Sequence, residues 1–501
     1  MTRTRNPGTR NPGTNNPGTN NPGSRNTAAI LTIILVSYFM ILLDNSVIFT
    51  ALPSLAVDLG LAPAELAWVQ DAYTLVFGGL LLLGARAGDI LGRRRVFVFG
   101  LAVFSIASLL IALAPTAWML IAARALQGVG AAIVAPSALS LLTASFEGAA
   151  RDRAVAWYAA TAGIGASLGM LVGGAAATLL SWRAGFWINV PIGIAMIVLA
   201  PRFLPETPTS PGRFDATGAI TSTLGIGALV FALLHGTDAG WGDPLTLASF
   251  AAATALLLVF VLAESRAAQP IMPLRLFSSR IRTGAYLVRL TYLGAMIGFF
   301  FFTTQFLQGV LGFTALQAGL AFLPMTVVNF VVAMAIPRLV ARVGNTWPLV
   351  VGVALTLAGM LWLSRLAPDS AYVTGVALPM LLIGAGQGLA FAPMTTFGIS
   401  GATTADAGAA SGVVNTFHQV GMSLGLGVLV AVAAASDVQG EATETALTGE
   451  VSAALTAAAV LLGVAVILVL ALIVPSRPRI PVVGGTVSTS LSTRPTRTLE
   501  A

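Results

Sequence analysis

The chain has 501 residues, of which 56% are hydrophobic and only 9% are charged. Such a composition leaves too little polar surface to cover a soluble globule of this size, so we predict an integral membrane protein. The chain has no cysteine, and its 26 basic residues are all arginine. Thiol nucleophiles, thiolate metal sites, Schiff bases and lysine-dependent phosphate loops are therefore excluded.

No cofactor or metal site is expected, because the two histidines, His235 and His418, are too far apart for a histidine metal motif. The net charge of +7 raises the question of a nucleic-acid partner. The arginines, however, are concentrated on one side of the predicted membrane spans. The excess of positive charge therefore reflects the orientation of the chain in the membrane, and we expect no nucleic acid to bind.

Residues 1–27 repeat Asn-Pro-Gly-Thr or Asn-Pro-Gly-Ser every five residues, and we expect them to be a disordered cytoplasmic tail. Hydrophobic spans with the length of membrane-crossing helices follow. We predict fourteen of them, at about 28–52, 66–85, 96–114, 117–143, 154–180, 184–204, 216–235, 245–263, 283–309, 316–337, 346–364, 371–397, 407–435 and 453–474.

Most arginines fall in the tails and in the loops on one side of this arrangement. By the positive-inside rule, both termini are then cytoplasmic. An arginine-only chain rich in alanine and glycine is typical of a GC-rich bacterial genome, so we expect a multi-pass protein of a bacterial inner (plasma) membrane.

The chain repeats itself at long range. Gln127-Gly128 recurs as Gln387-Gly388, and the segment 165–169 recurs as 421–425. Repeats of this kind are typical of secondary transporters, whose substrate site lies between the repeats near mid-membrane. We therefore expect an all-α membrane protein with two six-helix halves and two extra helices between them. The expected parts are the tail 1–27, the first half 28–204, the linker helices 205–263, the second half 264–475 and a cytoplasmic tail 476–501.

Asp44 lies inside the first apolar span, where a charged side chain costs about 2.5–3.5 kcal/mol. Asp71 lies at comparable depth in the second span. Each carboxylate could take up a proton outside and release it inside, or could be held by Asn45 or Tyr73 only to fix packing. We favour proton chemistry for Asp44 and leave both interpretations open for Asp71.

Two arginines also lie within spans. Arg124 cannot lose its charge, so it needs a carboxylate or a cluster of carbonyl groups. Arg289 lies near the inner end of its span, and we expect its side chain to reach back to the membrane surface.

Several segments together resemble the major facilitator superfamily, and in particular its fourteen-helix drug:proton antiporters of the EmrB/QacA type. The resemblance covers about residues 28–475. It is carried by the inner loop Gly84-Ala-Arg-Ala-Gly-Asp-Ile-Leu-Gly-Arg-Arg-Arg95, by Leu43-Asp-Asn-Ser-Val-Ile-Phe-Thr-Ala-Leu-Pro53, by Arg124-Ala-Leu-Gln-Gly-Val-Gly130, by the glycine-rich segment 165–174 and by Trp182-Arg-Ala-Gly-Phe-Trp-Ile-Asn-Val-Pro-Ile-Gly193. Two positions depart from the family pattern: Ala85 replaces a loop glycine, and Met170 replaces a proline that helps to bend helix five.

The resemblance implies roles for three groups of residues. It implies proton coupling at Asp44, Asp71 and Arg124. It implies a conformational gate at the inner loop, formed by Asp89, Gly92, Arg93 and Arg94. It also implies a sliding face on helix five, formed by Gly165, Gly169, Gly173 and Gly174. Without the resemblance, arginines in the inner loops indicate only the orientation of the chain in the membrane. A stripe of glycines on one helix face indicates only close helix packing.

Weaker candidates for a substrate cavity are Asn45, Tyr73, Phe302, Gln305 and His418. Phenylalanine runs and single histidines inside membrane helices are more often core residues, and that interpretation stays open for Phe302 and His418.

The sequence thus predicts a proton-coupled exporter of hydrophobic or amphipathic small molecules. We expect it to act as a monomer in the lipid bilayer by alternating access, and not to be an enzyme. One alternative is a facilitator specific for one metabolite, which Met170 favours. A more distant alternative is a membrane-embedded transferase, which would need acids or histidines clustered in one loop.

Overall fold

The computed structural model describes residues 22–207, 209, 215–267, 269–403, 406–436 and 443–476, and every regular element in these ranges is helical. Most of the tails predicted at 1–27 and 476–501 lies outside the described residues. The expectation of disorder is wrong for residues 22–27, because α1 begins at Pro22. The membrane helices and their short companions are α1 (Pro22–Leu59), α2 (Pro63–Leu91), α3 (Arg93–Ala112), α4 (Ala117–Ser145), α5 (Gly148–Leu179), α6 (Trp182–Trp187), α7 (Asn189–Phe203), α8 (Ala216–Ala239), α9 (Pro244–Arg266), η1 (Leu274–Ser278), α10 (Arg280–Gly309), α11 (Ala315–Ala321), α12 (Leu323–Val343), α13 (Thr346–Leu363), η2 (Tyr372–Ala377), α14 (Leu378–Ile399), α15 (Ala407–Ala435), α16 (Thr443–Leu468) and η3 (Val469–Ile473).

Thirteen helical segments in the described part of the chain are long and apolar enough to cross a membrane. The helix α5 lies where a further span was predicted, and its segment Leu168–Leu179 is apolar but shorter than the others. The prediction of an all-helical membrane protein is therefore confirmed, while the count of fourteen remains a prediction.

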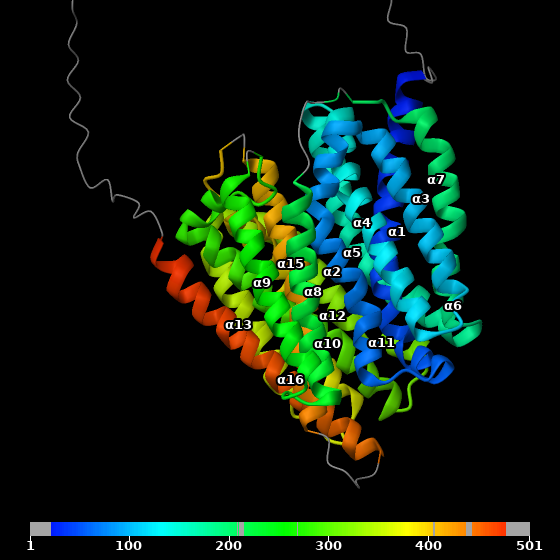
Figure 1. Cartoon of the computed structure of the whole chain (residues 1–501), viewed down its shortest axis with the longest axis vertical. Helices are drawn as coiled ribbons and strands as arrows, with labels where there is room; N and C mark the ends of the chain where they lie inside the picture. Colours follow the sequence, from blue (N-terminus) through cyan, green and yellow to red (C-terminus); the bar gives the residue numbers. More distant parts are fainter. Residues whose placement is uncertain are drawn as a thin grey trace, which may run out of the picture.

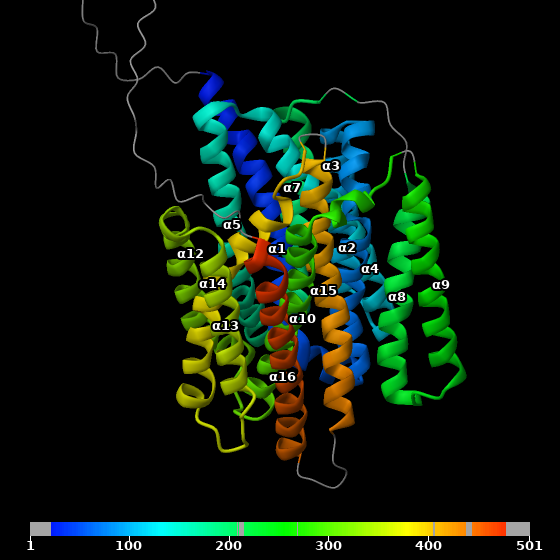
Figure 2. The ribbon, with the colours of Figure 1, turned by 90° about the vertical axis from the view of Figure 1, so that its left-hand side faces the viewer.

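The helices form two bundles (Figure 1). In the first, α1 packs on α5, and α4 packs on α2 and α3; in the second, α10 packs on α15 and α16, and α13 and α12 pack on α14. The pair α8 and α9 stands at the edge of the molecule in Figure 2, where α8 contacts α2 of one bundle and α15 of the other.

Glycines let the same helix pair approach closely in each bundle. A Cβ atom at Gly169 of α5 would lie 2.7 Å from the carbonyl oxygen of Leu43 in α1. In the second bundle, a Cβ atom at Gly425 of α15 would lie 2.1 Å from the Cα atom of Gly294 in α10. Contacts this short leave room only for glycine, so the repeated glycines in the sequence correspond to repeated packing in space.

The ends of the bundles can be named by their loops. The arginine-rich end carries Arg93–Arg95, and the acidic end carries Asp243 in the α8–α9 turn. At the acidic end the bundles contact each other, because the backbone N–H of Leu316 donates to Thr178 Oγ1 at 3.0 Å, and Gln308 Nε2 donates to the Thr50 carbonyl at 3.2 Å.

The helix α5 contacts the second bundle at the acidic end, where Gly174 faces Ala315 and Gly319 faces Met170. Towards the arginine-rich end, Trp157 of α5 is 59% exposed, and Met334 of α12 is 64% exposed. The helices α2 and α15 remain in contact there, since Thr416 Oγ1 donates to the carbonyl of Gly78 at 3.4 Å. The bundles are thus closed against each other at the acidic end.

Candidate functional site

Asp44 is fully buried and receives hydrogen bonds from three side chains on two other helices. Arg124 Nη1 of α4 donates to Oδ2 at 2.8 Å, Gln127 Nε2 of α4 donates to Oδ1 at 2.8 Å, and Asn189 Nδ2 of α7 donates to Oδ1 at 2.7 Å. Both members of the ion pair have no exposed surface. An ion pair this deep persists only when further hydrogen bonds satisfy it, and Gln127 and Asn189 supply them.

Arg124 is fixed in position from several sides. Its Nε donates to the Val69 carbonyl at 3.0 Å, and its Nη1 also donates to Gln127 Oε1 at 2.6 Å. The guanidinium lies over the Tyr73 ring, 4.4 Å from its centroid, which is cation–π geometry. Its Nη2 is buried and has no hydrogen-bond partner among the described residues. The guanidinium therefore keeps one NH2 group, with two N–H donors, free for a partner that moves.

Sequence reasoning selected Asp44, Arg124 and Tyr73 and missed the side chains that complete the cluster. Gln127 lies three residues after Arg124 and so on the same helix face, and its Nε2 also donates to Ser108 Oγ at 2.8 Å. Spacing could have pointed to Gln127. Nothing in the sequence placed Ser108 or Asn189 beside Asp44.

Asp71 lies outside this hydrogen-bonded cluster. It is fully buried, with Thr74 of the same helix and Ser423 of α15 as polar neighbours. Neither carboxylate oxygen accepts a hydrogen bond of normal geometry from a described residue. Asp71 thus lies where the two bundles meet, and its role in proton coupling remains a prediction.

The predicted gate residues tie the turn between α2 and α3 to the end of α7. Arg93 Nη2 pairs with Asp89 Oδ1 at 3.0 Å, and Arg94 Nε lies 3.4 Å from Glu206 Oε2. Gly92 has φ +98°, and a Cβ atom there would lie 2.8 Å from Glu206 Oε1, so this turn requires glycine. Sequence reasoning missed Glu206, although its place directly after a predicted span, facing an arginine-rich loop, was a usable signal. The gating role of these residues remains a prediction.

The glycines of helix five divide between two partners. Gly165, Gly169 and Gly173 face α1, whereas Gly174 faces α11 of the other bundle. A Cβ atom at Gly174 would lie 2.4 Å from the Ala315 carbonyl oxygen. This face of α5 is therefore both a packing surface within one bundle and a contact between the bundles.

The five residues predicted for a substrate cavity lie in separate surroundings. Tyr73 belongs to the Asp44 cluster, and Asn45 accepts a hydrogen bond from the neighbouring helix α2. Phe302 is buried in the core, and Gln305 donates to a carbonyl of its own helix α10. His418 belongs to a second polar cluster.

That second cluster is centred on Arg289 of α10, whose residue surface is 3% exposed. Its Nη1 donates to Thr395 Oγ1 at 2.8 Å, its Nη2 lies 3.1 Å from His418 Nδ1, and its guanidinium lies over the Phe391 ring at 4.4 Å. The prediction that this side chain reaches back to the membrane surface is wrong, because partners from α14 and α15 hold it inside the protein.

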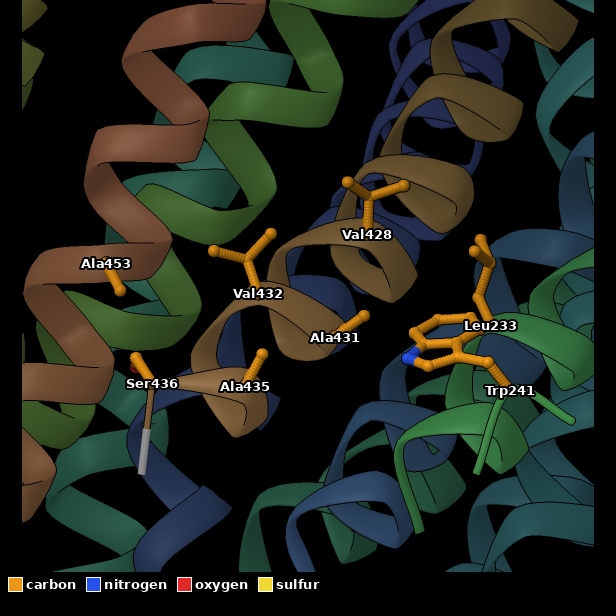
Figure 3. Close-up of a pocket in the computed structure, with 8 residues that line it drawn as sticks. All are labelled: Leu233, Trp241, Val428, Ala431, Val432, Ala435, Ser436 and Ala453. Carbon is orange, nitrogen blue, oxygen red and sulfur yellow. The ribbon is translucent and has the colours of Figure 1, made fainter. Parts of the chain in front are cut away.

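An apolar pocket of about 430 Å³ lies between α8 and the outer parts of α15 and α16 (Figure 3). Its walls carry no charged side chain, so it has no group that could pair with a charged substrate or carry a proton, unlike the clusters at Asp44 and Arg289. It is lined by Leu233, Trp241, Val428, Ala431, Val432, Ala435, Ser436 and Ala453.

Two helical bundles with repeated packing and a buried ion pair have the architecture of a secondary transporter. The chain belongs to the Major Facilitator Superfamily, whose family model matches residues 34–426. The superfamily predicted from the sequence motifs is thereby confirmed, and the fourteen-helix subtype remains a prediction.

The sequence is also similar to named export and resistance proteins. The chain is 43% identical over 402 residues to a cephamycin export protein of Amycolatopsis lactamdurans, covering 79% of this chain and 83% of that protein. It is 38% identical over 411 residues to a puromycin resistance protein of Streptomyces alboniger, covering 80% of each. Among solved structures, a bacterial homologue of the human lysosomal transporter Spinster, in an inward-facing and unoccupied conformation, matches with a TM-score of 0.64. That match has 16% identity and covers 90% of this chain and 97% of that one, so it supports the fold alone.

Proposed function

We propose that this protein is a proton-coupled exporter of hydrophobic or amphipathic small molecules, acting by alternating access. The observation that carries the proposal is the buried Asp44–Arg124 pair, in a chain whose relatives are named for antibiotic export and resistance. Those names support transport rather than catalysis. Lipid, protons and a small apolar substrate are then its partners, and we expect a single chain to suffice.

Asp44 has the surroundings that a proton-carrying group needs. While it is ionised, Arg124, Gln127 and Asn189 hold it on α1, α4 and α7. Adding a proton removes the charge that attracts Arg124, which weakens the ties between these helices. Proton uptake at Asp44 would thereby change the relative stability of the two conformations, which is what coupling requires.

The direction of transport follows from the positive-inside rule, which assigns the arginine-rich end to the cytoplasm of a bacterial cell. In the proposed cycle, substrate binds from that side while Asp44 is ionised, the bundles rock, and Asp44 takes a proton from outside. Each proton that returns down 100 mV releases about 2.3 kcal/mol, and each pH unit adds about 1.4 kcal/mol.

We propose supporting roles for the other predicted residues. Asp71, buried beside α15, would sense the separation of the bundles. The pairs that Arg93 makes with Asp89 and Arg94 makes with Glu206 would stabilise one state of the gate. The glycine face of α5 would permit sliding at the contact with α11.

A facilitator specific for one metabolite is the second candidate. It is favoured by Met170, which replaces the expected proline within the uninterrupted helix α5. The two functions differ in the number of substrates and in their dependence on the proton gradient. An exporter should transport several unrelated compounds and need the gradient, whereas a facilitator of this kind should transport one compound.

The test uses everted membrane vesicles from cells that express the chain and from cells that do not. We expect gradient-driven uptake of several unrelated dyes, including N-phenyl-1-naphthylamine and ethidium, and loss of that uptake when an uncoupler collapses the gradient. Uptake that survives the uncoupler, or that is limited to one compound, would favour the facilitator. No uptake of any dye would contradict the proposal.

A further inference from the structure

Arg289 is a buried cation that has no anion beside it. Its hydrogen-bond partners are the neutral groups of Thr395 and His418, and no ion pair joins it to a described carboxylate. Its Nε is buried without a partner among the described residues. Burying a charge without a counter-charge costs several kcal/mol, and charged side chains of this kind inside membrane proteins mark substrate or ion pathways.

The second bundle cannot supply that anion. Between Glu264 and Asp369 the sequence has no acidic residue, and the acids after Asp369 lie outside the apolar spans or at their ends. The first bundle has two buried acids at mid-membrane depth: Asp44, which is engaged by Arg124, and Asp71, which lies beside Ser423 of α15 and makes no ion pair with Arg289. The missing anion is therefore expected to come from outside the chain.

The walls around Arg289 are aromatic and extend across the boundary between the bundles. Tyr38 of α1 lies within electrostatic range of the guanidinium, and its ring stacks on Tyr158 of α5 with 4.0 Å between centroids. Phe391 covers another side and is 38% exposed. A cation between aromatic rings fits a molecule with an acidic group attached to an apolar or flat body.

His418 can add a second donor. Its Nδ1 faces a guanidinium N–H, which can only donate, so Nδ1 accepts and Nε2 carries the proton. His418 is partly exposed, and Asn415, one helical turn before it, is exposed. The cluster is thus not fully enclosed by protein on the His418 side.

We propose that Arg289, with His418, binds the anionic group of amphipathic organic anions such as carboxylates or sulfonates, and that such anions are among the exported substrates. This inference rests on the proposed export function and specifies its substrate class. It assigns the substrate contact to the second bundle, whereas the proton-coupling pair lies in the first.

The test uses two fluorescent probes that share one ring frame. 8-Anilinonaphthalene-1-sulfonate carries a sulfonate, and N-phenyl-1-naphthylamine lacks it. Binding is measured with the full chain in lipid nanodiscs, with the signal of empty nanodiscs subtracted. We compare wild type, Arg289→Gln and Arg289→Lys, together with Arg280→Gln, which removes an exposed arginine from the same helix α10.

We expect Arg289→Gln to raise the Kd for the sulfonate probe about tenfold or more, because a hydrogen-bonded charge is lost. The Kd for the neutral probe should not change. Arg289→Lys should keep part of the sulfonate affinity, and Arg280→Gln should keep all of it. If Arg289→Gln does not fold, Thr395→Asp, which places a carboxylate beside the guanidinium, should cause the same selective loss.

Wild type that fails to bind the sulfonate probe would overturn the inference, as would an equal loss of both probes in Arg289→Gln. Gradient-driven uptake of the neutral probe in vesicles would leave the proposed export function standing in either case. Absence of all uptake, with selective sulfonate binding intact, would overturn the export function and leave the anion site supported.

Discussion

The two bundles each bury one arginine, and the two arginines have opposite surroundings. Arg124 in the first bundle is paired with Asp44 at 2.8 Å and has no exposed surface. Arg289 in the second bundle is almost as deeply buried, yet its partners are a hydroxyl group and an imidazole. The first charge is neutralised within the chain, and the second is not.

This difference shows that the repeat preserves packing and not charge. The glycines that join α1 to α5 have counterparts that join α10 to α15. Gln127 corresponds to Gln387 in the repeat, which places Gly384 where the first bundle has Arg124. A second Asp–Arg pair is therefore absent at the equivalent position. This difference is consistent with the proposed division of roles, with proton coupling in the first bundle and substrate binding in the second.

Asp44→Asn makes the first cluster resemble the second, since it leaves Arg124 without a carboxylate. We expect the protein to insert but to lose gradient-driven efflux. Loss of one coupled proton at 100 mV removes about 2.3 kcal/mol of driving force. The highest substrate concentration ratio that the protein can maintain across the membrane then falls about 50-fold. Dye accumulation in everted vesicles measures this ratio.

The matched control for this variant is Asp58→Asn, which removes a carboxylate from the same helix at a partly exposed position. It should retain coupling. Full resistance to toxic substrates in cells that express Asp44→Asn at normal levels would refute the role of Asp44.

Cross-linking the two bundles to each other tests whether transport requires them to move relative to each other. The chain has no cysteine, so Thr178→Cys with Leu316→Cys introduces the only thiols, at a contact of 3.0 Å between α5 and α11. A short reducible bifunctional thiol reagent should abolish transport, and reduction should restore it. The single-cysteine variants treated in the same way are the controls, and undiminished transport in the cross-linked protein would contradict alternating access.

Thr395→Asp makes the second cluster resemble the first by placing a carboxylate beside Arg289. We expect the KM for the sulfonate probe to rise about tenfold, equivalent to about 1.4 kcal/mol of binding, while the neutral probe is unaffected. Thr395→Asn has nearly the same shape without the charge and should transport both probes normally. Equal KM values for the sulfonate probe in these two variants would show that charge at this position has no part in recognition.

The smallest effect is expected outside the membrane spans, where Arg275 Nη2 pairs with Asp406 Oδ1 at 2.6 Å and joins η1 to the start of α15. Hydrogen bonds from this guanidinium hold the pKa of the Asp406 carboxyl below its usual range. A carboxyl with a lowered pKa stabilises the fold above its unfolded pKa of about 3.9, and this contribution is lost as the pH falls through the folded pKa.

Arg275→Gln should therefore lower the thermal midpoint slightly at pH 7, and its difference from wild type should shrink as the pH falls below about 4. Transport should be unchanged, since neither polar cluster is touched. A difference that persists in acid would mean that the arginine acts through packing and not through its charge.

The sequence by itself determined the membrane class and the approximate spans, and it singled out Asp44 and Arg124 as charges inside apolar spans. These follow from local properties, because an apolar run of bilayer length and a charged residue within it can be recognised without knowing any partner. The glycine repeats were also visible, and they predicted the close packing of α5.

Only the tertiary structure decided which groups surround these charges. Asn189 meets Asp44 across 145 residues, and His418 meets Arg289 across 129. Helix contacts at such separations depend on how whole bundles pack, and no local pattern encodes them. For the same reason Arg289, which sequence position alone assigned to the membrane surface, was found only in the structure to be a buried charge without an anion.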